Sequence, residues 1–333
     1  MESLDLFRNV WYVLIGFLFL GYSILDGFDL GIGILFPFLA KDEKDKRVLF
    51  GSIAPFWDGN EVWLITGGAA LFAAFPQAYA TVFSGFYLAL MLVLFALIFR
   101  AVSIEFWHTD EKRRKFWEWA FVIGSFLPSL LYGVALGNVV FGIPLNENMD
   151  FTGNFFILLR PYPLIIGLLG LSAIMLQGCT YAALKTNGLL QTKARKIVKI
   201  VWFVFVVLLI LSFIATLIYI PENCGNFLAI LSAVIVWTAV ILNRIYLYKG
   251  KGKIAFYMSS LAFTGLWGIV GAVHFPNLVS ASNDPNLSLT IYNASSGELT
   301  LKIMLIIALI GMPIVIFYTA YVYKVFRGKV IYD

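Results

Sequence analysis

Long apolar runs constrain the fold of this 333-residue chain more than any other feature. About 20 apolar residues at ~1.5 Å each cover the hydrocarbon core of a bilayer, and such runs recur along the sequence. With 61% apolar and only 13% charged residues, the excess is too large for a soluble core to bury. We therefore predict an all-α integral membrane protein, with residues 1–333 as a single polytopic domain. Its nine predicted spans are 10–39, 48–73, 79–106, 119–141, 161–184, 198–220, 226–248, 254–275 and 300–324.

The distribution of lysine and arginine sets the predicted orientation. Of the 24 Lys and Arg residues, 20 follow the first, third, fifth and seventh spans or lie in the C-terminal tail. Basic residues accumulate on the cytoplasmic side of membrane proteins, so the N-terminus is predicted outside and the C-terminus in the cytoplasm. The first span contains Asp26 and Asp29 and has no basic n-region, so we do not expect a cleaved signal peptide.

Six ionisable residues lie inside the predicted spans. A charge at the bilayer centre costs about 2.5–3.5 kcal/mol or more, so each should face the interior of the bundle. Counting along the helices places Asp29 and Asp58 level with each other, ~15 Å from the cytoplasmic ends, and Asp26 and Glu61 ~4–5 Å deeper. The other two lie near the cytoplasmic end of the third span. The six residues outline a polar line from the cytoplasm to mid-membrane: Asp26, Asp29, Asp58, Glu61, Arg100 and Glu105.

Two interpretations of this polar line are open. In the structural one, Arg100 neutralises a carboxylate, and the two aspartates of the first span accept hydrogen bonds that lock the bundle. In the functional one, Asp58 and Glu105 conduct protons and Glu61 is a further station. The reason is that a carboxyl group withdrawn from water can bind and release a proton near neutral pH.

Histidine and cysteine are too scarce to suggest a metal or haem site. His108 falls at the cytoplasmic edge and His274 at the outer edge, so the two cannot ligate one haem from opposite faces. No metal is expected in this chain. Cys179 and Cys224 have no CxxC spacing, and we interpret them as a small packing residue and an outer-loop thiol.

Two tryptophans and two glycine pairs have positions that suggest specific contacts. Trp57 and Trp63 flank the acids of the second span at mid-membrane, which indicates an aromatic-lined cavity or contact with an apolar ligand, with core packing as the alternative. Small residues allow close approach of membrane helices. We expect such contacts at Gly27 with Gly31 and at Gly67 with Gly68.

Two motifs make the sequence closely resemble subunit II of the bacterial cytochrome bd-type quinol oxidases. They are Asp26-Gly-Phe-Asp-Leu-Gly-Ile-Gly33 and Trp57-Asp-Gly-Asn-Glu-Val-Trp-Leu64. The resemblance spans essentially the whole chain and continues, in order, through Gly67–Pro76, Phe83–Tyr87, Phe99-Arg100, Gly137-Asn138, Thr152–Phe156, Gln177-Gly178 with Thr180-Tyr181, and Leu299–Leu301. Two positions depart from some family members, because Phe56 stands where they have His and Glu61 where they have Gln.

The resemblance implies one subunit of a complex in the bacterial plasma (inner) membrane that oxidises quinol and reduces dioxygen to water. It implies nine helices arranged as in the cytochrome bd subunits and no catalytic residue in this chain. Haems b558, b595 and d are expected in subunit I, with none bound by this chain. Some family members hold a structural quinone in subunit II.

The resemblance also implies residue roles and partners. Asp58 and Glu105 match a proton path toward haem d, and Trp63 matches an apolar oxygen route. The expected partners are the haem-bearing subunit I, a small single-helix subunit, membrane quinol and the lipid bilayer, with no nucleic acid.

Two other function classes are weighed against this one. An ion-coupled secondary transporter would also place carboxylates at the midplane. The odd number of spans and the lack of an inverted repeat argue against it. The other class is a purely structural membrane subunit, in which the buried acids serve only as interhelical pairs.

Overall fold

Helices make up nearly all of the described chain, which comprises residues 2–221 and 225–330 of a computed structural model. This confirms the all-α prediction. The helices are α1 (Glu2–Leu39), α2 (Glu43–Ile53), α3 (Trp57–Ala74), α4 (Pro76–Gly85), α5 (Tyr87–Thr109), α6 (Arg114–Phe141), α7 (Pro161–Lys185), α8 (Gly188–Tyr219), α9 (Phe227–Tyr248), α10 (Gly252–His274) and α11 (Glu298–Val325). Short 3-10 turns follow α5 (Glu111–Arg113), precede α7 (Phe155–Leu159) and lie between α10 and α11 (Pro285–Leu287).

Most predicted spans coincide with one helix each. Eight of the described helical segments are long and apolar enough to cross a membrane. The predicted second span is the exception, because residues 48–73 form two helices rather than one, α2 and α3. The third span is also interrupted, at Phe86 between α4 and α5.

The interruption of the second span lies at residues 54–56. Pro55 has no backbone N–H to continue the helix, and the Phe56 N–H instead donates to the Ile53 carbonyl at 2.8 Å. A new helix, α3, then begins at Trp57 with Asp58 in its first turn. An acidic residue there is stabilised by the positive end of the helix dipole.

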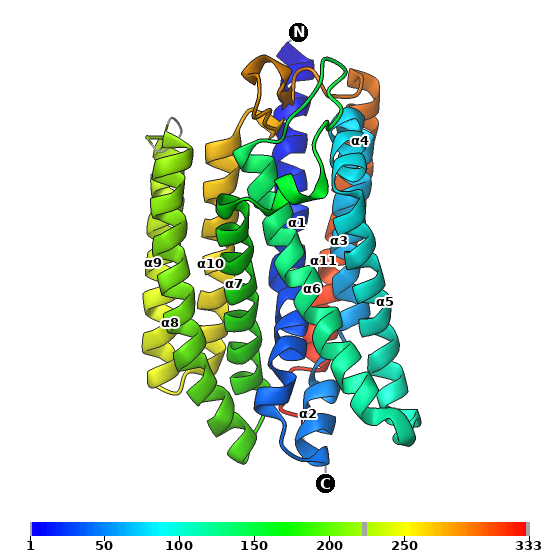
Figure 1. Cartoon of the computed structure of the whole chain (residues 1–333). Helices are drawn as coiled ribbons and strands as arrows, with labels where there is room; N and C mark the ends of the chain where they lie inside the picture. The colour runs from blue at the N-terminus through cyan, green and yellow to red at the C-terminus, as the bar shows by residue number, and fades with distance from the viewer. Residues whose placement is uncertain (1, 222–224, 331–333) are drawn as a thin grey trace.

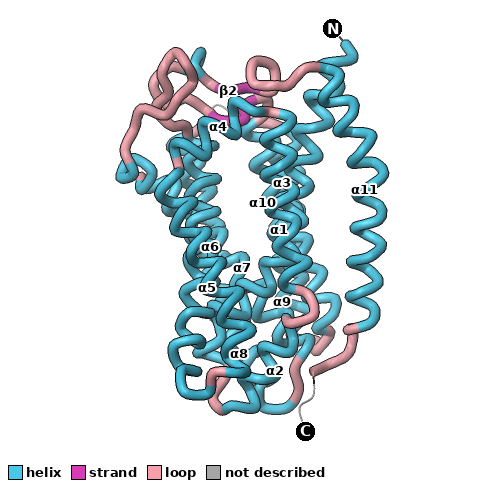
Figure 2. Tube along the Cα trace, turned by 90° about the vertical axis from the view of Figure 1, so that its right-hand side faces the viewer, coloured by secondary structure: helices cyan, strands magenta, loops and turns pink. Residues whose placement is uncertain are grey.

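The helices form an elongated bundle with the two chain termini at opposite ends (Figure 1). We call these the N-terminal end and the C-terminal end. The connections rich in lysine and arginine lie at the C-terminal end with α2, as the predicted alternation requires. The central helix α1 packs against α3, α6, α7 and α10. By contrast, α11 runs along the outside of the bundle (Figure 2), and Leu301 is its only buried residue among those described.

A small cap closes the N-terminal end. Strand β1 (Asn277–Val279) pairs antiparallel with β2 (Leu289–Thr290), and Val279 and Leu289 are buried in a second apolar cluster there. The Trp11 indole N–H donates to the Leu301 carbonyl at 2.9 Å. Beside the cap, this hydrogen bond ties the first turn of α11 directly to α1.

Small residues bring α1 and α7 into direct backbone contact. A Cβ atom placed on Gly31 would lie 2.3 Å from the Ile174 carbonyl oxygen, and one placed on Gly178 would lie 2.4 Å from the Gly31 carbonyl carbon. The predicted close contact is confirmed at Gly31. It is wrong at Gly68, where a Cβ atom would meet nothing within 4 Å.

Replacing Gly31 with alanine should destabilise the protein by about 1–3 kcal/mol or more, because the added methyl group meets backbone atoms that cannot rotate away. Gly16→Ala in the same helix is the matched control, since a Cβ atom there meets nothing within 4 Å. The thermal midpoint of the detergent-solubilised protein measures the difference. Equal midpoints for the two variants would contradict the packing described here.

Candidate functional site

A buried ion cluster centres on Arg100 of α5. Its Nη2 donates to Asp26 Oδ1 at 3.0 Å, and its Nη1 donates to the Glu61 carboxylate. The side chains of Arg100 and Asp26 are fully buried, whereas that of Glu61 is 21% exposed. One guanidinium thus joins α1, α3 and α5. This is the arrangement expected in the structural interpretation, in which Arg100 neutralises carboxylates.

Close packing of the α5 and α6 backbones near Arg100 explains how its guanidinium group reaches the interior of the bundle. A Cβ atom on Gly124 of α6 would lie 2.6 Å from the Ala96 carbonyl oxygen and 2.8 Å from Arg100 Cβ. Helices α5 and α6 therefore touch directly at this level. The close approach leaves the long arginine side chain to extend toward α1 and α3, where both of its partners lie.

A second polar group lies one helical turn away, around Asp29. Asn60 Nδ2 donates to Asp29 Oδ2 at 2.7 Å and also contacts the Leu25 carbonyl at 3.2 Å. The Tyr323 hydroxyl of α11 donates to Asn60 Oδ1 at 3.2 Å. This group links α1, α3 and α11, and it is the main polar connection between α11 and the interior.

Asn60 and Tyr323 are site residues that the sequence reasoning missed. Asn60 lies between two acids of the same span, so a search for buried amides as well as charges would have found it. Tyr323 carried no such signal, because tyrosines near the end of a span are common in interfacial belts.

Not every polar atom of these two groups has a partner within the chain. In the described residues, Asp29 Oδ1 and Arg100 Nε are buried and have no hydrogen-bond partner. Buried polar atoms in proteins are normally satisfied, often by ordered water. Ordered water can satisfy these two atoms.

Asp58 and Glu105 lie on the outer surface of the chain, so the prediction that they face the bundle interior is wrong. Their side chains are exposed in the isolated subunit. On α3 the buried residues Asn60 and Trp63 face α1, and Asp58 is two residues before Asn60, about 200° around the helix. On α5, Ile104 is buried and faces the bundle. Glu105 is the next residue, about 100° around the helix, and faces outward.

The two tryptophans lie on α3, and Trp63 is well buried. A Cβ atom on Gly21 of α1 would lie 2.2 Å from the Trp63 ring, and Phe17 packs edge-on at 6.0 Å between ring centroids. Trp57 is half-buried. Trp63 therefore takes part in helix packing, which was the alternative interpretation. The suggested oxygen route or quinone contact stays a prediction.

The two histidines lie too far apart to ligate one haem together. His108 lies in the last turn of α5 at the C-terminal end, and His274 lies in the last turn of α10 at the opposite end (Figure 1). Within residues 2–221 and 225–330, no three His, Cys, Asp or Glu side chains group as metal ligands. Cys179 is a free, buried thiol, and Cys224 lies outside the described residues.

Comparisons with known proteins identify relatives over the full length. Residues 7–326 match the family model for cytochrome bd terminal oxidase subunit II. The chain is 34% identical to cytochrome bd-I ubiquinol oxidase subunit 2 of Escherichia coli K12, over 99% of this chain and 97% of that protein. It is 35% identical to cytochrome bd ubiquinol oxidase subunit 2 of Bacillus subtilis 168, over 97% and 96%.

A solved structure has the same fold. A chain of the bd oxidase from Geobacillus thermodenitrificans matches with a TM-score of 0.82 at 15% identity, covering 96% of this chain and 98% of that one.

Proposed function

Because this chain belongs to the cytochrome bd terminal oxidase subunit II family, we propose that it is the haem-free half of a quinol:dioxygen oxidoreductase, stabilising a haem-bearing subunit I and supplying it with cytoplasmic protons. The chain is a subunit of an oxidoreductase complex in the bacterial inner membrane. Its relatives from Escherichia coli and Bacillus subtilis are described as ubiquinol oxidase subunits, which supports a quinol as the electron donor.

The partner surface proposed here comprises the outer faces of α3, α5 and α11. Large apolar side chains are exposed on all three helices, among them Ile65, Phe95 and Ile310. Lipid could cover such side chains, but it could not cover Asp58, whose carboxyl group would cost about 2.5 kcal/mol or more in hydrocarbon. The exposed Asp58 on an otherwise apolar helix face is the observation that supports a protein–protein interface over a lipid boundary.

A proton route along this surface would use the acids in order of depth. Glu105 lies near the C-terminal end of α5 and is closest to the predicted cytoplasm. Asp58 lies in the first turn of α3, and Glu61 follows one turn later. Glu61 is partly exposed and bound to Arg100, so it would connect the surface residues with the buried cluster.

The proposal that subunit I holds the haems and this chain holds none can be tested by absorption spectroscopy. We expect an affinity tag on this chain to recover a complex with the absorption bands of b-type and d-type haem. Stripping the partner with detergent should then leave this chain without any haem band, because the proposal assigns all the haems to subunit I. A haem band that stays with the stripped chain would overturn the proposal that this subunit is haem-free.

A further inference from the structure

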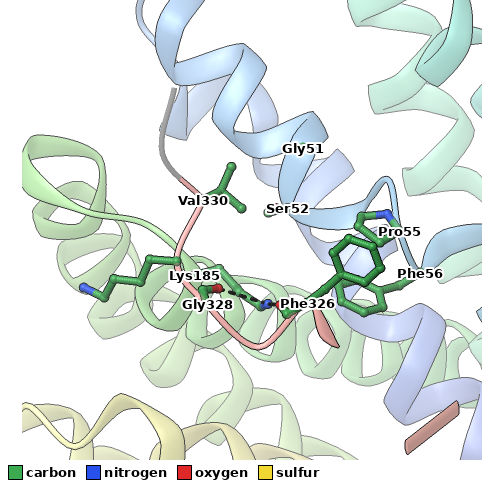
Figure 3. Close-up of a pocket in the computed structure, with 9 residues that line it drawn as sticks. Gly51, Ser52, Pro55, Phe56, Lys185, Phe326, Gly328 and Val330 are labelled. Carbon is green, nitrogen blue, oxygen red and sulfur yellow. Dashed lines mark hydrogen bonds between the residues drawn. The ribbon is translucent and has the colours of Figure 1, made fainter. Parts of the chain in front are cut away.

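The residues after α11 turn back under the C-terminal end of the bundle and pack against the end of α7 (Figure 3). The Val330 N–H donates to the Lys185 carbonyl at 3.0 Å. Lys329 Nζ donates to Asn187 Oδ1 at 2.7 Å in the turn between α7 and α8. We call residues 326–330 the C-terminal latch, because these contacts hold the lower end of the otherwise peripheral α11 against the bundle.

Lys185, the last residue of α7, is the main attachment point of the latch. Its Nζ donates to the Phe326 carbonyl at 2.5 Å and to the Gly328 carbonyl at 3.3 Å. The same ammonium group lies 5.3 Å from the centre of the Phe56 ring. Lys185 is only 7% exposed, and within the described residues no carboxylate lies at ion-pair distance from it. Its charge is therefore stabilised chiefly by the latch carbonyls and by aromatic rings.

The latch forms one wall of a partly open pocket of about 240 Å³. The inner wall of the cavity is the interrupted part of the second span, with Ser52, Pro55 and Phe56, and the outer wall is the latch itself (Figure 3). A water molecule needs about 30 Å³ in the liquid, so the cavity has room for several.

Only one aromatic layer separates this cavity from the buried polar group. Phe56 stacks on Tyr323 with 4.5 Å between ring centroids. The Tyr323 hydroxyl in turn donates to Asn60, and Asn60 donates to Asp29. A line of neighbouring groups therefore runs from the C-terminal end into the bundle: the cavity, the aromatic pair, Asn60 and then Asp29. This line does not include the exposed Asp58 and Glu105.

We propose that the C-terminal latch controls access to a second water route from the cytoplasm to the Asn60–Asp29 pair, with Lys185 as the residue that holds the latch over the buried Ser52. As a path for protons, this route rests on the proton supply proposed above. As a path for water, the route does not depend on that proposal, because the latch contacts and the cavity exist whether or not the chain supplies protons. The latch and the proton supply can therefore fail separately.

Access to the cavity is measurable with a cysteine at Ser52, which lines it and is buried. Ser52→Cys is placed in the whole complex after Cys179→Ser and Cys224→Ser remove the native thiols. Inverted membrane vesicles then expose the cytoplasmic side to a small, membrane-impermeant methanethiosulfonate reagent. We expect slow labelling with Lys185 present and labelling faster by about tenfold or more with Lys185→Met, because the charge-assisted hydrogen bonds that hold the latch are lost.

Lys249→Met is the matched control. Lys249 is an exposed lysine at the same end of the bundle, in the connection before α10, and does not line the cavity. It should leave the labelling rate unchanged. Equal rates for Lys185→Met and Lys249→Met would overturn the latch, while leaving the proton supply through Asp58 and Glu105 untouched.

A truncation after Val325 keeps the test decisive if Lys185→Met fails to assemble. Removing the latch should raise the labelling rate at least as much as Lys185→Met does, because it also removes the Val330 and Lys329 contacts. Adding Lys185→Met to the truncation should change nothing further, because its latch partners are already gone. A truncated complex that labels as slowly as the full chain would overturn the proposal.

Discussion

Replacing Arg100 with leucine should reduce the amount of assembled oxidase to a small fraction of the native level. The change leaves Asp26 fully buried without its cationic partner, and breaking a buried ion pair from one side costs about 3–5 kcal/mol. Three helices lose their common attachment at once, since Arg100 joins α1, α3 and α5. The haem absorption of membranes, per amount of this chain, measures the assembled fraction.

Two companion variants separate charge from packing. Arg113→Leu makes the same substitution at an exposed arginine and should leave assembly unchanged. Combining Arg100→Leu with Asp26→Asn and Glu61→Gln should restore much of the assembly, because no unpaired charge is then left in the interior. Native-level assembly of Arg100→Leu alone would contradict the role of the cluster. A triple variant no better than the single one would assign the loss to packing rather than to charge.

Replacing Asp58 with asparagine should slow quinol oxidation by about tenfold or more while the haem spectrum stays native, since positioned proton-transfer groups typically contribute at least that much. Asp58 is exposed on this chain and has no ion-pair partner among the described residues, so its loss should not unfold the subunit. Oxygen consumption with excess quinol, normalised to haem content, measures the effect.

Glu105→Gln should behave in the same way as Asp58→Asn, since it removes the carboxyl group that we propose as the cytoplasmic entrance of the same route. Glu147→Gln removes an exposed carboxyl group in the loop before α7, away from the route, and should leave turnover at the native rate. Unchanged turnover in an assembled Asp58→Asn, Glu105→Gln double variant would favour a purely structural subunit instead.

The membrane-crossing architecture was predictable because the lipid imposes it on the sequence. Helices α6 to α11 begin and end within a few residues of the predicted spans except at the start of α8, where ten residues of basic, amphipathic sequence extend the helix beyond the apolar run. The break between α2 and α3 was not predictable from proline alone. Pro37, Pro128 and Pro313 all lie inside uninterrupted helices, whereas Pro55 ends one.

The candidate site was only partly predictable, because charge and depth identify residues but not the faces on which they lie. Asp26, Asp29 and Arg100 were expected inside the bundle, and they are. The same rule failed for Asp58 and Glu105, which lie exposed on the chain, and in our proposal a partner subunit rather than the chain's own interior shields them from lipid. Predicting the Arg100–Glu61 contact also required the three-dimensional structure, since the spacing of residues in the sequence does not show which helices pack together.

The central claim is that this subunit delivers protons to its partner, and proton uptake tests it most directly. A pH indicator on the cytoplasmic side can follow proton uptake when the fully reduced complex, in membrane vesicles, reacts with a single pulse of oxygen. We expect Asp58→Asn to slow proton uptake by about tenfold or more and to leave reduction of the haems by quinol unchanged. Uptake at the native rate in the assembled Asp58→Asn complex would contradict it.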